Sequence, residues 1–174
     1  MQVEVLGNEA AVASSAAEFI AAQAAAAIAA RGRFTFAVSG GHTPWVMLRA
    51  LAEEKVDWTN VQLFQVDERV APPGDDSRNL THIRESLLAH VRLPPRNVHP
   101  MPVEAADLAA AARQYAQTLA TIAGTPPVLD LVHLGLGPDG HTASLVPHDP
   151  VLEDRKSTRL NSSHSQQSRM PSSA

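Results

Sequence analysis

The sequence predicts an α/β domain, with an open and mostly parallel Rossmann-like sheet flanked by helices. Short runs rich in β-branched and aromatic residues alternate with alanine-rich stretches of helical length. This alternation is typical of parallel strands joined by crossover helices. Peculiar loops with glycine, proline or charged residues follow directly after three of the predicted strands. Open α/β sheets hold their ligands at these carboxyl ends of the strands.

The first half of the domain contains two helices and two strands. Asn8 is placed to cap a helix that runs to about Arg31 through a stretch rich in alanine, the best helix former. Its larger apolar contacts are expected from Val12, Phe19, Ile20 and Ile28. Residues 34–38 (FTFAV) and 61–66 (VQLFQV) form strands. Between them, Pro44 opens a helix over about residues 45–52, because its missing N–H is harmless there.

The second half continues the alternation. Ser77 or Asn79 is expected to cap a helix that ends near His90, and residues 98–101 form a short strand. An amphipathic helix follows over about residues 104–122. Residues 129–134 (LDLVHL) are expected to form a buried strand. The loops after these strands, at residues 39–44, 67–79 and 135–144, should therefore meet at one edge of the sheet.

Composition excludes several functional classes. The chain has 174 residues, which suits one domain with a core of its own, and it has no cysteine. Disulfide scaffolds, thiolate zinc sites and cysteine nucleophiles are thereby excluded. The net charge of -4 argues against nucleic-acid binding through phosphate contacts. No uninterrupted apolar run approaches the roughly 20 residues of a membrane span, and the N-terminus lacks the basic region of a signal peptide. We expect a cytoplasmic protein that does not bind membranes.

The last 20 residues differ from the rest of the chain. From Arg155 onward there are four basic residues and seven serines but no acid, so residues 1–154 carry 10 basic and 18 acidic side chains and a net charge of -8. So little apolar content predicts a disordered tail over residues 155–174.

The loop at residues 39–44 (SGGHTP) predicts an anion site. Gly40 and Gly41 let the backbone approach a ligand closely, and the free N–H groups of a helix start favour an anion. Ser39 and Thr43 add hydroxyl donors. The Lys-Ser/Thr ending of a P-loop is absent. The alternative is a plain strand-to-helix turn that needs glycine only for its backbone.

A second loop begins with Asp67, Glu68 and Arg69. Arg69 could clamp a phosphate with two hydrogen bonds while a neighbouring acid holds it in position. The alternative is a solvated cluster of surface charges.

The third loop holds the candidate base. Residues 135–140 (GLGPDG) fit the dinucleotide pattern G-x-G-x-x-G, but Pro138, the lack of a long helix after it and its late place in the chain argue against that function. Asp139 stands two residues before His141, and an imidazole oriented by a carboxylate suits general-base activation of water. The alternative is that His141 only bonds the backbone.

Metal and serine chemistry lack their usual patterns. Histidines are present at positions 42, 133, 141 and 148, but no H-x-x-x-H or H-E-x-x-H pair occurs. Ser144 lacks the G-x-S-x-G surroundings of a serine hydrolase. We therefore expect no metal.

Three motifs together resemble the 6-phosphogluconolactonase family, within the superfamily of glucosamine- and galactosamine-6-phosphate isomerases. They are SGGHTP (39–44), VDERVAPPGDDSRN (66–79) and LGLGPDGHTASLVP (134–147). The resemblance covers roughly residues 1–153 and implies a NagB-type fold and a cofactor-free hydrolase of the pentose phosphate pathway. Such an enzyme opens 6-phospho-D-glucono-1,5-lactone, with His141 as general base and Asp139 supporting it. Arg69, Thr43 and the turn Ser39-Gly40-Gly41 would bind the phosphate.

Two other functions share this fold. Glucosamine-6-phosphate deaminases have the motif G-H-I-A-F-N-E-P, whose acid falls on Val146 here, and a tyrosine in place of Arg69. Both departures favour the lactonase. Sugar-phosphate sensor domains are the non-enzymatic alternative, against which the Asp139 and His141 pair argues.

The resemblance stops near Asp154, although the family continues through further strands and helices. We therefore expect residues 1–154 to be a partial domain whose C-terminal part is missing, and residues 155–174 to be foreign sequence.

Overall fold

The computed structural model describes residues 3–153, and the tail predicted at 155–174 lies outside them. In chain order the helices and strands are α1 (Glu9–Arg31), β1 (Phe34–Val38), α2 (His42–Ala52), β2 (Val61–Gln65), α3 (Asn79–Ile83), β3 (Val98–His99), α4 (Leu108–Ala123) and β4 (Leu131–Val132). Short 3-10 turns lie at Trp58–Asn60, Pro95–Asn97 and Pro150–Glu153, and a π-helical turn at Arg84–Leu88 extends α3.

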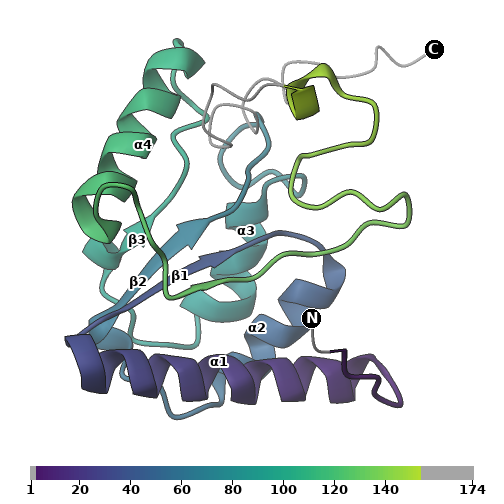
Figure 1. The fold of residues 1–174 in the computed structure, drawn as a ribbon, viewed down its shortest axis with the longest axis vertical. Coiled ribbons are helices and arrows are strands. Elements are labelled where there is room, and N and C mark those ends of the chain that lie inside the picture. The colour runs from purple at the N-terminus through teal and green to yellow at the C-terminus, as the bar shows by residue number, and fades with distance from the viewer. Residues whose placement is uncertain (1–2, 154–174) are drawn as a thin grey trace.

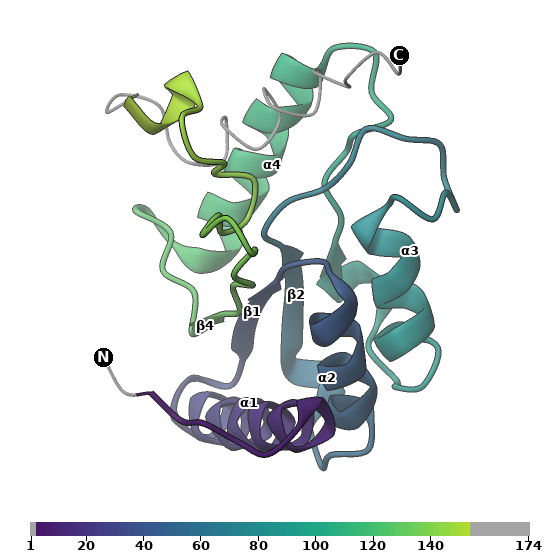
Figure 2. The same cartoon turned by 90° about the vertical axis from the view of Figure 1, so that its right-hand side faces the viewer.

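The strands form one sheet in the order β3-β2-β1-β4, and each neighbouring pair is parallel. Helices cover both faces: α1, α2 and α3 lie on one side of the sheet and α4 on the other (Figures 1 and 2). This arrangement confirms the predicted α/β class with an open parallel sheet.

Alternating side chains of β1 and β2 build two cores. Phe34, Phe36 and Leu63 pack with α1 and α2 on one face. Phe64 packs on the other face with Tyr115 and Leu119 of α4. Successive side chains of a strand point to opposite faces. These two five-residue strands, buried on both sides, therefore contribute side chains to both cores.

Helix α1 begins and ends where the sequence predicts, but it packs through different residues. The side chain of Asn8 accepts a hydrogen bond from Ala11 N and caps the helix. Phe19 and Val12, expected in the core, are 58% and 41% exposed. The buried face consists of small residues around Ile20, namely Ala13, Ala17, Ala21, Ala24 and Ala27. Their methyl groups let α1 lie close against its neighbours, a packing that bulky side chains would prevent.

By length and hydropathy alone, α1 is the one helix in residues 3–153 that could cross a membrane. The sequence expectation rested on uninterrupted apolar runs alone and therefore did not identify α1. In the structure α1 packs along β1 and α2, and its alanine face belongs to the core. A core helix of this kind meets the same length and hydropathy criteria as a membrane span.

Several predicted boundaries are wrong by a few residues. Helix α2 begins at His42 rather than near residue 45, so Pro44 lies inside the first turn, where its missing N–H still costs nothing. Helix α4 begins at Leu108 rather than near residue 104, because Asp107 caps it by accepting from Ala110 N at 2.9 Å. The strand predicted at residues 98–101 is shorter, Val98–His99.

The helix after the second loop differs more. Neither Ser77 nor Asn79 caps it with its side chain: Arg78 occupies the cap position, and regular α-helix ends at Ile83 rather than near His90. The hydroxyl and N–H of Ser77 instead bond Asp75. The first N–H groups of α3 therefore find their acceptor elsewhere in the fold, as described below.

The strand predicted at residues 129–134 is neither long nor buried. Only Leu131–Val132 pairs with β1, and Val132 is 47% exposed. Within the described residues β4 pairs with a strand on one side only. Asp130 compensates for the short pairing, because its carboxylate accepts from Thr35 N at 2.7 Å, from the Thr35 hydroxyl at 2.9 Å and from Arg31 at 2.5 Å.

Asp130 should make the attachment of β4 dependent on pH. Burial raises the pKa of Asp130, but the hydrogen bonds from Thr35 and the charge of Arg31 outweigh it and lower the pKa overall. A lowered pKa adds stability above the ordinary value of about 3.9, and this stability is lost as pH falls through the folded value.

We predict that Asp130→Asn lowers the free energy of unfolding by about 1.5–3 kcal/mol near pH 7, the range for a hydrogen bond to a charged group. The loss should shrink as the pH falls below about 4 and through the lowered pKa of the folded carboxylate, where wild type loses the same charge. Urea unfolding at several pH values measures this, with the exposed Asp76→Asn as the control. An equal loss at pH 3 and pH 7 would contradict the role of the ionised group.

Candidate active site

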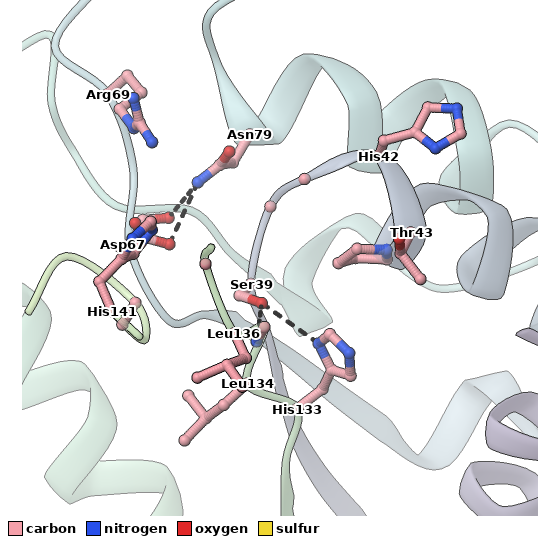
Figure 3. Close-up of a pocket in the computed structure, with 16 residues that line it drawn as sticks. Ser39, His42, Thr43, Asp67, Arg69, Asn79, His133, Leu134, Leu136 and His141 are labelled. Atoms are coloured by element: carbon pink, nitrogen blue, oxygen red, sulfur yellow. Dashed lines mark hydrogen bonds between the residues drawn. The ribbon is translucent and has the colours of Figure 1, made fainter. Parts of the chain in front are cut away.

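The loops after β1, β2 and β4 line one cavity of about 510 Å³ at the carboxyl ends of the strands. Six of the seven predicted site residues line it: Ser39, Gly40, Gly41, Thr43, Arg69 and His141. The seventh, Asp139, does not line the cavity itself but bonds His141, which does. In Figure 3, Arg69, Asp67 and His141 lie on one side of the cavity, Thr43 and His42 lie on the other, and Ser39 and His133 lie below.

The glycine turn leads from β1 into α2 at one end of the cavity. Gly41 has a φ of 117°, which favours glycine, and α2 begins at the next residue. A helix start carries free N–H groups and partial positive charge, so this end of the cavity can accept an anion. The hydroxyl of Thr43 here donates to Glu9 at 3.2 Å, and an anion would have to compete with that carboxylate.

Ser39 is buried and hydrogen-bonded, so it is not the free hydroxyl donor that the sequence predicts. It is 3% exposed, and its Oγ accepts from Gly135 N at 3.1 Å. The same Oγ lies 3.3 Å from Nδ1 of His133, whose pKa is lowered by burial. A neutral His133 can accept a hydrogen bond from the Ser39 hydroxyl. Ser39 therefore joins the end of β1 to the loop that carries His141.

The acids of the second loop are not a solvated surface cluster, which corrects that alternative. Asp67 is 4% exposed and Glu68 is fully buried. The sequence predicts an acid that holds Arg69, but the guanidinium beside Glu68 is that of Arg78, with Nε 3.3 Å from Oε2. Arg69 is exposed at the cavity, and its side chain makes no ion pair with any carboxylate of residues 3–153.

Glu68 supplies the acceptor that α3 lacks. Its Oε1 accepts from the N–H groups of Arg69 and Asn79, both at 2.7 Å, and its Oε2 accepts from Leu80 N at 2.9 Å. Gln65 Nε2 also donates to Oε2 at 2.8 Å. One carboxylate therefore caps the helix from 11 residues away and fixes both ends of the loop.

His141 and Asp139 form a compact pair at the edge of the cavity. Nδ1 of His141 lies 2.5 Å from Oδ1 of Asp139, which also accepts from His141 N at 3.2 Å. These hydrogen bonds from His141 lower the pKa of Asp139, so the carboxylate stays ionised beside the ring. With Nδ1 bound to Asp139, Nε2 is the ring nitrogen available to take a proton.

Glycine at position 137 leaves the space that this pair needs. A Cβ on Gly137 would lie 2.2 Å from two ring atoms of His141 and 2.9 Å from the Asp139 carboxylate. The backbone also closes the turn, because Gly137 N donates to His141 O at 2.8 Å. The G-x-G-x-x-G pattern of this loop thus forms a turn that accommodates His141 and does not open a dinucleotide-binding helix.

The lining residues that were not selected from the sequence include Asp67, Asn79 and His133. Asp67 and His133 each stand at or just after the end of a strand, as Ser39 does, and that position alone could have selected them. Asn79 had no such signal, because it reaches the site only when α3 folds back. In residues 3–153, no three His, Asp or Glu side chains gather as a metal site would require.

Comparisons with known proteins agree on one family. Residues 7–173 match the family described as glucosamine-6-phosphate isomerases/6-phosphogluconolactonase. The 6-phosphogluconolactonase of Synechocystis is 41% identical over 155 residues, a match that covers 87% of this chain and 65% of that protein. This chain thus spans about two thirds of the length of the curated relatives it matches.

Solved structures show the same fold. A 6-phosphogluconolactonase from Shewanella baltica superposes with a TM-score of 0.75 at 31% identity, covering 88% of this chain and 64% of that one. A monomeric glucosamine-6-phosphate deaminase superposes with a TM-score of 0.71 at 21% identity, over 82% of this chain and 58% of that one. The deaminase likeness is one of fold alone.

We predict that Gly137→Ala displaces His141 from Asp139, because the added methyl group would overlap the ring. The ring nitrogen signals of His141 in a long-range ¹H–¹⁵N spectrum should shift. Gly135→Ala is the matched control, since its Cβ would meet only Ser39 Oγ at an ordinary 3.6 Å. Unchanged His141 signals in Gly137→Ala would contradict the geometry of this turn.

Removing the charge of Glu68 should destabilise the fold strongly. Glu68→Gln removes the buried one of the two carboxylates that pair with Arg78, leaving the partly exposed Glu104, and it weakens the cap of α3. We therefore expect a loss of about 3–5 kcal/mol in the free energy of unfolding. Urea denaturation measures it beside Glu18→Gln, an exposed position on α1. A loss under 1 kcal/mol would mean that the buried carboxylate does not anchor this loop.

Proposed function

This chain belongs to the family of glucosamine-6-phosphate isomerases and 6-phosphogluconolactonases, and on that premise we propose that it hydrolyses 6-phospho-D-glucono-1,5-lactone to 6-phospho-D-gluconate. This reaction belongs to the pentose phosphate pathway and would place the protein in the cytoplasm. The observation that carries the proposal is the pairing of His141 with Asp139 at the cavity that Arg69 and the glycine turn also line.

The proposed reaction needs a base, and His141 suits that task. Nε2 of His141 takes a proton from a water molecule as the water oxygen bonds to the lactone carbonyl carbon. The imidazolium that forms is stabilised by the Asp139 carboxylate at 2.5 Å. The proton then passes to the ring oxygen as its bond to the carbonyl carbon breaks, which opens the ring and leaves His141 neutral. No metal or organic cofactor enters these steps.

The phosphate of the substrate needs local positive groups. Arg69 presents to the cavity a guanidinium that pairs with no carboxylate of residues 3–153, and α2 directs the free N–H groups of its first turn toward the same space. We assign phosphate binding to Arg69, the turn Ser39-Gly40-Gly41 and Thr43. Ser39 would contribute chiefly by holding that turn against the His141 loop.

Hydrolysis of freshly generated lactone tests the base. We expect His141→Ala to lower the catalysed rate by about 10²–10⁴-fold, the usual contribution of a general base. His90→Ala, an exposed histidine at the end of the π-helical turn, should keep the wild-type rate. If the wild-type chain is no faster than the spontaneous reaction, the lactonase proposal fails; if His141→Ala keeps the full rate, only the role of His141 fails.

The role of Arg69 predicts a separate kinetic signature. Arg69→Ala removes an interaction made equally in the bound substrate and the transition state, so KM should rise about 10- to 100-fold while kcat changes little. Arg92→Ala, an exposed arginine away from the cavity, is the control. Wild-type KM in Arg69→Ala would remove Arg69 from the phosphate site. Release of ammonia from glucosamine 6-phosphate would favour the deaminase, and binding without turnover a sensor.

A further inference from the structure

The Asp67 carboxylate joins two of the loops that form the cavity. Its Oδ2 accepts from the Ser144 hydroxyl at 2.8 Å, and Ser144 belongs to the loop of His141. Its Oδ1 lies 3.3 Å from Nδ2 of Asn79 at the start of α3. We propose that Asp67 and Ser144 are positioning residues, whose hydrogen bond holds His141 in place for the hydrolysis proposed above. This inference rests on that function.

The Ser144 bond is the main polar attachment of the loop beyond Gly135. The hydrogen bonds of Gly137, Gly140 and Leu145 all close turns within the loop itself. Asp139 and His141 likewise bond each other. Between residues 136 and 148, the Ser144 side chain makes the one hydrogen bond to another element of the described chain. The position of His141 relative to the cavity therefore depends on Ser144.

The loop adopts a backbone conformation that needs such an attachment. Ala143, between His141 and Ser144, has a φ of 53°, in the left-handed region that residues with a side chain rarely occupy. Residues persist there when their surroundings fix them, and such strain gathers at functional sites. The bond from Leu145 N to Thr142 O at 3.0 Å closes the turn, and Ser144 ties that turn to the end of β2.

The acceptor itself is held rigidly. Asp67 is 4% exposed, so its hydrogen bond to Ser144 forms away from water and is charge-assisted. Nδ2 of Asn79 also donates to the backbone O of Asp67 at 3.0 Å. The glycine turn packs against the same amide, since a Cβ on Gly40 would lie 1.8 Å from Asn79 Oδ1. All three loops of the cavity thus meet at Asp67 and Asn79.

The test is Ser144→Ala in the full chain, with Ser144→Thr as the variant that keeps the hydroxyl and Ser14→Ala on α1 as the matched control. Per folded molecule, we expect Ser144→Ala to lower kcat about 10- to 100-fold, as a displaced base would, with KM within about twofold of the wild-type value. Ser144→Thr should restore most of kcat, and Ser14→Ala should not change it.

A second measurement does not depend on turnover. Backbone ¹⁵N relaxation over residues 137–145 should show faster local motion in Ser144→Ala than in wild type, and no such change in Ser14→Ala. Unchanged relaxation together with unchanged kcat would overturn the positioning role. A fall in thermal stability without any loss of kcat per folded molecule would likewise assign Ser144 to stability alone.

The two proposals fail separately. If the wild-type chain hydrolyses no lactone but Ser144→Ala loosens residues 137–145, the proposed function fails, and Ser144 still holds the loop. If wild type is active and depends on His141 while Ser144→Ala has wild-type kcat and relaxation, only the present inference fails.

Discussion

The fully buried carboxylate of Glu68 is the interaction on which the geometry of the site depends. A buried anion is costly unless donors surround it, and here three backbone N–H groups, one amide and the Arg78 guanidinium do so. Two of those N–H groups belong to the start of α3 and one to Arg69. The end of β2 and the start of α3 therefore cannot move independently, and Asp67 and Asn79 are kept within reach of each other.

This arrangement also explains how an acidic protein can offer a site for an anion. Residues 1–154 carry a net charge of -8, so the field of the whole domain does not attract a phosphate. The buried carboxylates of Asp67 and Glu68 accept hydrogen bonds from donors within the protein. Arg69, the next residue of this loop, lines the cavity and pairs with no carboxylate of the described chain. Local donors can then dominate where the ligand would bind.

The sequence could predict features that depend on residues close together in the chain, but not features that depend on distant contacts. Three features depend on neighbours a few residues away and could be predicted from the sequence. They are strand β1, the Asn8 cap and the pairing of Asp139 with His141. The meeting of the three loops followed from a topological rule, since parallel strands end at one edge. The short exposed β4 was not predictable, because LDLVHL is apolar enough for a buried strand, and its exposure goes with its place as the last strand of the sheet among the described residues.

The residues that the sequence did not identify depend on contacts between parts of the chain that are far apart in the sequence. Asn79 caps nothing with its own side chain, although its type and place suggested a cap; Glu68 supplies the acceptor, and that frees the Asn79 amide to bind Asp67. Ser144 stands 77 residues from Asp67, and no local pattern joins them. A loop sequence can thus specify a histidine with its carboxylate, whereas the place of that pair over the cavity is specified by contacts that exist only after the sheet has formed. The chemistry of this site is local, and its alignment is a property of the whole fold.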